Sequence, residues 1–144
     1  MKLSNILVAY DGSVLSEKAL RHAADYAKDF PECKLEVVHV LKFPNVVLGQ
    51  AYMTTTPGMK EAIYEEAEAV VKRAEKILQS LDVSHRVTML EGNPAAEIVQ
   101  YAKRAGSQLI VIGSRGLSGL KKLMLGSVSH HVVQLSDIPV LVVK

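Results

Sequence analysis

The residues best suited to chemistry lie in one glycine-rich stretch, GSRGLSGLKKLMLGSVS, at residues 113–129. The short apolar run LIVI leads into it and is typical of a buried strand. Gly126 then precedes Ser127, Ser129 and an apolar-periodic segment, which indicates the start of a helix. Free N–H groups and the dipole at a helix start attract anions, and glycines let a phosphate approach the backbone. The stretch predicts a phosphate-binding loop, although a purely structural strand-to-helix loop has the same outline.

The spacing of these residues is Gly113, two residues, Gly116, nine residues, Gly126 and then Ser127. It lacks the Lys-Ser/Thr ending of the Walker loop, and it does not fit the GxGxxG pattern of dinucleotide sites. The arrangement resembles the nucleotide-binding signature of the universal stress protein family, in the branch that binds ATP. Three basic residues add positive charge along the loop: Arg115, Lys121 and Lys122.

The elements that must position this loop alternate along the chain. Apolar runs predict strands at residues 5–9, 34–41, 83–91, 109–112 and 137–144. Helices are predicted from Ser13 to about Phe30, over 59–81, from Asn93-Pro94 to a cap at Gly106, and after Gly126. The alternation predicts one domain over residues 1–144, an α/β fold with an open five-stranded mostly parallel sheet in a Rossmann-like α/β/α sandwich. Its switch point is expected between the first and fourth strands.

Three residues or segments outside the loop leave alternatives open. Asp11 ends the first strand, where open sheets place ligands, but it could instead cap the following helix or close the turn. His39, among valines, is expected to be a hydrogen-bonded core residue. The irregular segment from Phe43 to Gly58 is either a lid over the site or disordered.

Composition limits the classes of protein and of partner. Apolar residues make up 49% of the 144 residues, and the formal net charge is +2. These values favour a globular domain and give no electrostatic case for nucleic-acid binding. No apolar run approaches the ~20 residues of a membrane span, and the amino terminus does not have the pattern of a signal peptide. With its single cysteine, Cys33, the chain is expected in the cytoplasm, away from membranes.

The resemblance covers essentially the whole chain and implies an ATP-binding protein of stress adaptation. Supporting features are Tyr10-Asp-Gly-Ser, His39-Val40, Gly92-Asn-Pro and the closing PVLVVK. It implies that Ala9, Asp11 and Val40 line the adenine and ribose and that Gly113 meets the ribose. The residues implied to hold the phosphates, with Mg²⁺ or Mn²⁺ between them, are Gly116, Gly126, Ser127, Val128 and Ser129.

Asp11 is the one acidic residue that the sequence places at the site. Phosphoryl transfer needs a group that orients the nucleophile and ligands for metal ions, so a regulatory binding protein with at most weak ATP hydrolysis is favoured. The alternatives are a slow ATPase or autophosphorylating enzyme, and a nucleotide-independent chaperone or scaffold. The apolar last strand, Val140 to Val143, is expected to pair with a second copy in a homodimer.

Overall fold

The computed structural model describes residues 2–44, 46–48, 51–53, 55–116 and 124–144. Its centre is a five-stranded sheet with the strand order β5-β2-β1-β6-β7, in which every neighbouring pair is parallel. The predicted α/β fold and the predicted switch point are therefore confirmed, since β1 lies between β2 and β6. The strands are β1 (Asn5–Ala9), β2 (Lys34–Leu41), β5 (His85–Glu91), β6 (Leu109–Gly113) and β7 (Val140–Val143).

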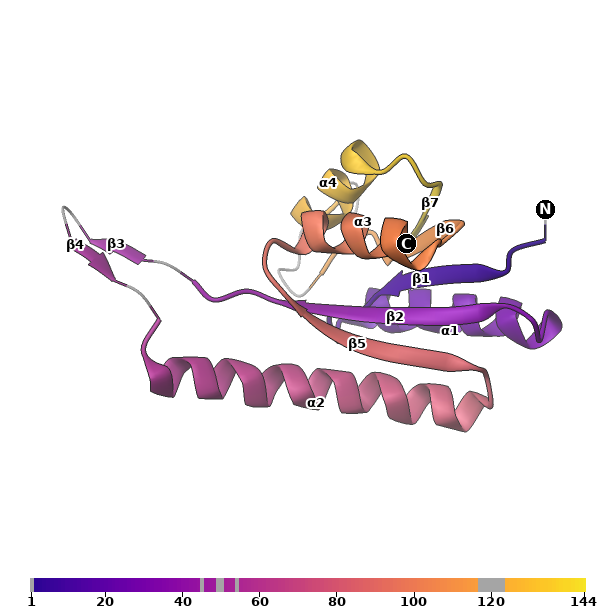
Figure 1. Cartoon of the computed structure of the whole chain (residues 1–144), viewed down its shortest axis with the longest axis horizontal. Helices are drawn as coiled ribbons and strands as arrows, with labels where there is room; N and C mark the ends of the chain where they lie inside the picture. Colours follow the sequence, from indigo (N-terminus) through magenta and orange to yellow (C-terminus); the bar gives the residue numbers. More distant parts are fainter. Residues whose placement is uncertain (1, 45, 49–50, 54, 117–123) are drawn as a thin grey trace.

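Helices cover both faces of the sheet (Figure 1). On one face, α1 (Val14–Asp29) and α2 (Pro57–Leu81) pack against a core that includes Val8, Val37 and Val111. On the other face, α3 (Pro94–Ala105) and α4 (Ser127–Leu135) pack on the opposite side chains of the same strands. Alternation along β1 explains the division, because successive side chains of a strand point to opposite faces. None of the helices in the described part of the chain is long and apolar enough to span a membrane.

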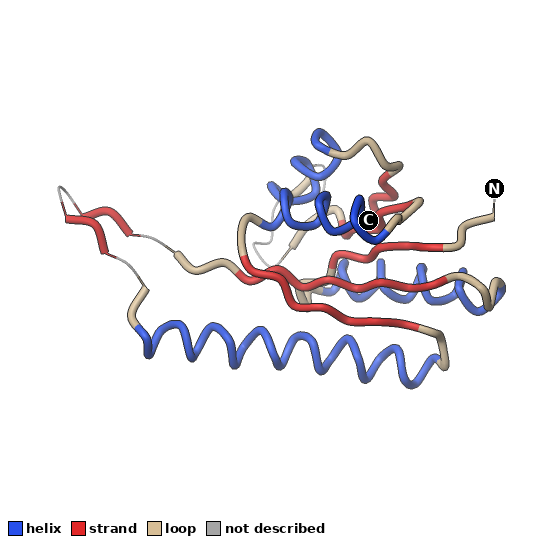
Figure 2. Tube along the Cα trace, in the orientation of Figure 1, coloured by secondary structure: helices blue, strands red, loops and turns tan. Residues whose placement is uncertain are grey.

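Two short strands lie in the segment from Phe43 to Gly58 that was expected to be irregular. β3 (Val46–Leu48) and β4 (Ala51–Met53) form an antiparallel pair that stands away from the main sheet (Figures 1 and 2). The next helix, α2, begins at Pro57, two residues earlier than predicted, because the Thr56 hydroxyl accepts a hydrogen bond from Met59 N at 3.3 Å.

The predicted helix starts at α1 and α3 are also confirmed by their capping geometry. Ser13 accepts a hydrogen bond from Ser16 N at 3.2 Å, and Asn93 accepts one from Ala96 N at 3.2 Å. Gly106 ends α3 with a φ of 68°, a left-handed conformation that favours glycine. These caps fix the two helices whose first turns border the carboxyl ends of β1 and β5.

Candidate functional site

A pocket of about 290 Å³ opens at the carboxyl ends of β1 and β6. This is the switch point of the sheet, where open α/β folds bind ligands. No described residue of the 43–58 segment lines the pocket, so the described residues do not form a lid over it. Every residue that the sequence assigned to the site lines it: Ala9, Asp11, Val40, Gly113, Arg115, Gly116, Gly126, Ser127, Val128 and Ser129.

Part of the pocket wall is apolar and comes from residues that the sequence analysis did not assign to the site. Val38 and Ile112 contribute from the sheet, and Pro94 and Ile98 contribute from α3. Their spacing in the sequence is that of ordinary core residues, so no local pattern distinguishes them. Topology provides the missing signal, because all four lie near the carboxyl end of the sheet on the face covered by α3 and α4. Such a wall suits a flat, largely apolar ring.

The first turn of α4 contributes polar groups to the pocket. Gly126 is its N-cap residue, with extended dihedral angles and no side-chain cap. The first intrahelical hydrogen bond is donated by His130 N to Gly126 O at 2.9 Å. The N–H groups of Ser127, Val128 and Ser129 precede it and have no backbone acceptor among the described residues. Three donors at the positive end of a helix are suited to an anion.

Hydrogen bonds hold this helix start against the loop that follows β6. Gly126 N donates to Ser114 O at 2.6 Å, so this N–H is engaged and does not face the pocket as a free donor. The hydroxyl of Ser129 is buried, with Ser114 O at 2.9 Å and Gly126 O at 3.0 Å. The Ser129 hydroxyl is therefore engaged within the loop and is not a free donor in this structure. Its backbone N–H and the exposed hydroxyl of Ser127 are the groups that remain available.

Gly126 has an ordinary backbone conformation. Its φ is −64°, which any residue can adopt, so the turn does not require glycine for conformational reasons. A Cβ at this position would instead lie 3.3 Å from Arg115 Cα and 3.4 Å from Ser114 O. Close approach of the loop backbone is therefore the physical reason for the glycine.

Asp11 lies across the pocket at the end of β1. Its Oδ1 accepts a hydrogen bond from Ser13 N at 2.9 Å and so closes the turn, while Ser13 itself caps α1. Its other oxygen, Oδ2, faces the glycine loop, since a Cβ on Gly116 would lie 2.6 Å from it. The turn passes through Gly12, whose φ of 83° favours glycine. The carboxylate therefore closes the turn and also faces the pocket, so the two predicted roles of Asp11 are compatible.

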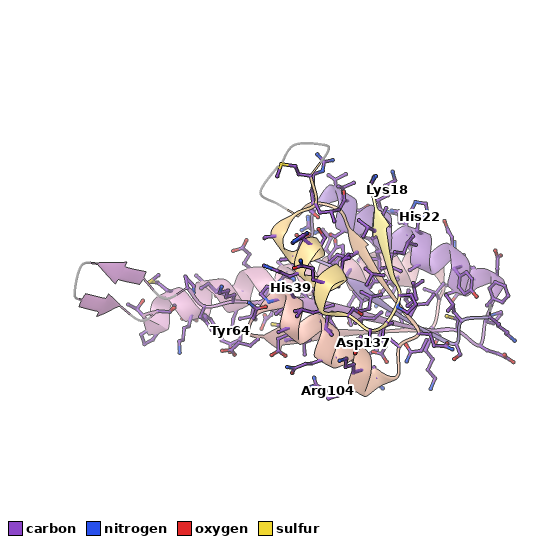
Figure 3. All side chains as sticks on the ribbon, turned by 90° about the horizontal axis from the view of Figure 1, so that it is seen from above. Lys18, His22, His39, Tyr64, Arg104 and Asp137 are labelled. Carbon is purple, nitrogen blue, oxygen red and sulfur yellow. The ribbon has the colours of Figure 1, made fainter. Side chains whose placement is uncertain are left out.

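The histidines and the cysteine fit structural roles. His39, labelled in Figure 3, has its Nδ1 2.9 Å from Tyr10 O, so the expected hydrogen bond is confirmed. The side chain is half-buried rather than in the core, and it lines the pocket. His130 and His131 have ring centroids 6.0 Å apart and do not line the pocket. Cys33 is buried, and this burial raises the pKa of its thiol, as expected of an unreactive cysteine.

Some of the predicted charge lies outside the described residues. Lys121 and Lys122 belong to the segment 117–123, which the structure does not describe, as does Gly119. Within the described ranges, Arg115 is the cationic residue that lines the pocket and Asp11 is the acidic one. No group of three or more His, Cys, Asp or Glu residues that could hold a metal occurs in the described part of the chain.

Residues 2–144 match the sequence profile of the universal stress protein family. The chain belongs to this family. It is 39% identical to universal stress protein YxiE of Bacillus subtilis over 98% of this chain and 99% of YxiE. The solved structure of protein MJ0577, from Methanocaldococcus jannaschii, superposes with a TM-score of 0.81 at 28% identity, over 98% of this chain and 95% of that one.

Another similar solved structure contains a nucleotide. The universal stress protein from Archaeoglobus fulgidus in complex with dAMP has a TM-score of 0.73 at 26% identity, and each chain is covered over its full length. Members of the universal stress protein family thus bind nucleotides on this Rossmann-like fold.

Proposed function

We propose that the protein binds ATP in the switch-point pocket and acts as a regulatory protein of stress adaptation. The observation that carries the proposal is the first turn of α4, where the N–H groups of Ser127, Val128 and Ser129 border the same pocket as Asp11. An anion is favoured at the helix start and a hydroxyl-bearing group is favoured at the carboxylate. A ribose joined to phosphates carries both kinds of group.

The adenine is assigned to the apolar wall. Ala9 and Val40 lie at the ends of β1 and β2, and a backbone group of Val40 can recognise a base without any particular side chain. Asp11 and Gly113 are assigned to the ribose. Nucleotide in the dAMP complex of the Archaeoglobus relative supports an adenine nucleotide as the ligand class.

The phosphates are assigned to Gly116, Gly126, Ser127 and the first backbone N–H groups of α4, with Arg115 beside them. A divalent cation, Mg²⁺ or Mn²⁺, fits as a companion of the phosphates rather than as a separately held ion. The described residues contain no cluster that would bind it alone, and the cation supplies charge neutralisation to the triphosphate when bound.

Binding is favoured over efficient catalysis. Asp11 is the acidic side chain lining the described pocket, and its Oδ1 is engaged in the turn. An ATPase needs a group that orients the attacking water, and the described pocket offers no second carboxylate for this task. We therefore expect at most weak ATP hydrolysis, with a slow ATPase or autophosphorylating enzyme as the second candidate. A nucleotide-independent chaperone or scaffold is the third.

The test is calorimetry with ATP, AMP, NAD and FMN in the presence of magnesium. ATP is expected to bind most tightly, because the helix start and loop are suited to several phosphates and the chain lacks a dinucleotide loop. Tighter binding of NAD or FMN would contradict the proposal, and equal binding of AMP would contradict the role of the loop. Chromatography of the ligand released on denaturation, together with turnover of labelled ATP, separates the three candidate functions.

A further inference from the structure

A second hollow, of about 530 Å³, lies at the amino ends of β1, β2 and β5. It shares no lining residue with the nucleotide pocket, which is at the carboxyl ends of the same sheet. Along β2, from Lys34 to Val40, the two sites are roughly 20 Å apart at ~3.3 Å per residue. Its size lies within the range of small-molecule sites in proteins.

The hollow exists because α3 ends before it covers the corner of the sheet. Asn5 Nδ2 donates to Ala105 O at 2.7 Å and so holds the last turn of α3 over β1. Tyr101 donates its hydroxyl hydrogen to Glu36 Oε2 at 2.9 Å, and the Thr88 hydroxyl lies 3.3 Å from the Tyr101 oxygen. These bonds give the hollow an ordered polar floor between β2, β5 and α3.

The rim of the hollow carries an excess of positive charge. Lys34 begins β2, Arg86 follows the first residue of β5, and Arg104 lies in the last turn of α3, labelled in Figure 3. All three side chains are exposed, and none has a carboxylate within ion-pair distance among the described residues. Glu36, the acidic residue in the lining, already accepts from Tyr101.

The neighbouring groups offset only part of this charge, because the lining holds one carboxylate, Glu36, against three cations. His85 also lines the hollow, but its Nε2 faces Glu75 of α2 at 4.0 Å, on the other face of the sheet. Arg86 is the register partner of Glu36 on the adjacent strand. Since side chains alternate along strands, Lys34, Glu36 and Arg86 share the face on which α3 packs. The three cations therefore border one solvent-filled space from three different elements.

We propose that this hollow binds a small polyanion that carries phosphate or carboxylate groups. Two guanidinium groups and one ammonium group lie around a volume that can accept it. Arginine recognises phosphate and carboxylate through paired N–H donors, and lysine adds a point charge. An anion there also relieves the repulsion between the three like charges. The site makes the protein a receptor for two ligands, one at each end of the sheet.

The experiment is a two-dimensional NMR titration of the ¹⁵N-labelled protein with pyrophosphate and, separately, with citrate. Backbone amides report each site independently, so binding at residues 84–86 and 101–105 is distinguished from binding at 126–129. Saturable shifts at the first group are expected with at least one probe, and the stronger probe identifies a phosphate or a carboxylate ligand. Arg86→Gln is expected to weaken this binding at least fivefold, and Lys34→Gln provides a second, independent variant.

Arg21→Gln is the matched control, because Arg21 is a surface arginine paired with Glu17 on α1, away from the hollow. It is expected to leave the affinity at the hollow unchanged. Shifts confined to residues 126–129, linear shifts that do not saturate, or equal losses in Arg86→Gln and Arg21→Gln would overturn the proposal. The spectrum of each variant before titration is compared with that of the wild type and shows whether the variant is folded. If one of the two hollow variants is misfolded, the other one tests the proposal.

Discussion

At the scale of single residues, the three glycines of the signature have three different physical roles. A Cβ on Gly113 would lie 2.9 Å from Leu15 C, so this glycine allows α1 to pack on the end of β6. A Cβ on Gly116 would lie 2.6 Å from Asp11 Oδ2, and one on Gly126 would meet the loop backbone. Gly113 thus serves helix packing, Gly116 leaves room for the Asp11 carboxylate, and Gly126 lets the start of α4 close on the loop.

Gly113→Ala is expected to lower stability more than it lowers nucleotide affinity per folded molecule. The added methyl group would lie 3.0 Å from Ser16 N as well as close to Leu15, and backbone atoms cannot yield as a flexible side chain can. Overpacking of this kind costs about 1–3 kcal/mol. Urea unfolding measures the loss, with Gly58→Ala as the control because a Cβ there meets nothing within 4 Å. Equal stability of the two variants would contradict the packing role.

Gly126→Val is expected to reduce ATP affinity by about tenfold or more, which corresponds to ~1.4 kcal/mol. The valine would press on Arg115 Cα and Ser114 O and separate α4 from the loop, so the N–H groups of the first turn would move. Ser127→Ala removes one exposed hydroxyl and keeps the backbone donors, so its loss is expected to be smaller. Calorimetry with ATP and magnesium, paired with circular dichroism melts, measures both.

The same titration with Lys121→Ala separates backbone from side-chain recognition. Salt screens the charge of a side chain, so this variant is expected to lose least. If Lys121→Ala lost the most affinity while folded Gly126→Val bound normally, side-chain charge would hold the phosphates and the proposed backbone cradle would be wrong.

At the scale of elements, the sequence predicted best those segments whose ends carry a local chemical signal. Helix α3 begins after Asn93 and ends before Gly106, as expected. The side-chain acceptor of Asn93, the fixed φ of Pro94 and the left-handed conformation of Gly106 each act within a few residues, so the sequence reveals them. β3 and β4 were missed because three-residue strands are too short to have a recognisable period. The end of α2 at Leu81 was predicted correctly from the apolar period alone, because its left-handed cap is Asp82 rather than glycine.

Asn93→Ala is expected to destabilise the protein by about 1 kcal/mol, in the range 0.5–2 for a lost N-cap. Asn93 Oδ1 accepts from Ala96 N, and the exposed side chain has little packing to lose. Chemical denaturation measures the change. Asn93→Ser keeps an acceptor at the cap and is the control, expected to retain most of the stability. If serine cost as much as alanine, the hydrogen bond would not be the cause.

At the scale of the whole molecule, the parallel sheet and its switch point could be predicted from the alternation of strands and helices and from the handedness of the crossovers, and so could the polar half of the site. Gly113, Gly126 and Asp11 each end or begin an element, and parallel topology brings such ends together. The apolar wall could not be predicted, because Ile98 and Ile112 resemble any other core residue. The basic hollow combines the ends of β2, β5 and α3, and its charges are adjacent only after the sheet order is known.

The backbone of the edge strand β7 indicates how a homodimer would form. Pro139 O accepts from Ile110 N and Val143 O accepts from Ser114 N, so the odd-numbered residues direct their carbonyls toward β6. Because direction alternates along a strand, the N–H and C=O of Val140 and Val142 point away from the sheet. Leu141 adds an apolar side chain that is 47% exposed. A second β7 can pair with this edge in antiparallel orientation about a two-fold axis.

Val142→Pro is therefore expected to convert a homodimer into a monomer. Proline removes the outward N–H of residue 142, whereas the hydrogen bonds to β6 depend on its odd-numbered neighbours and remain. Light scattering at micromolar concentration is expected to give twice the 15.7 kDa chain mass for the wild type and the chain mass for the variant. Val133→Ser, an exposed position on α4 outside the strand, is the control and is expected to remain dimeric. A monomeric wild type, or a folded Val142→Pro variant that is still dimeric, would show that β7 is not the interface.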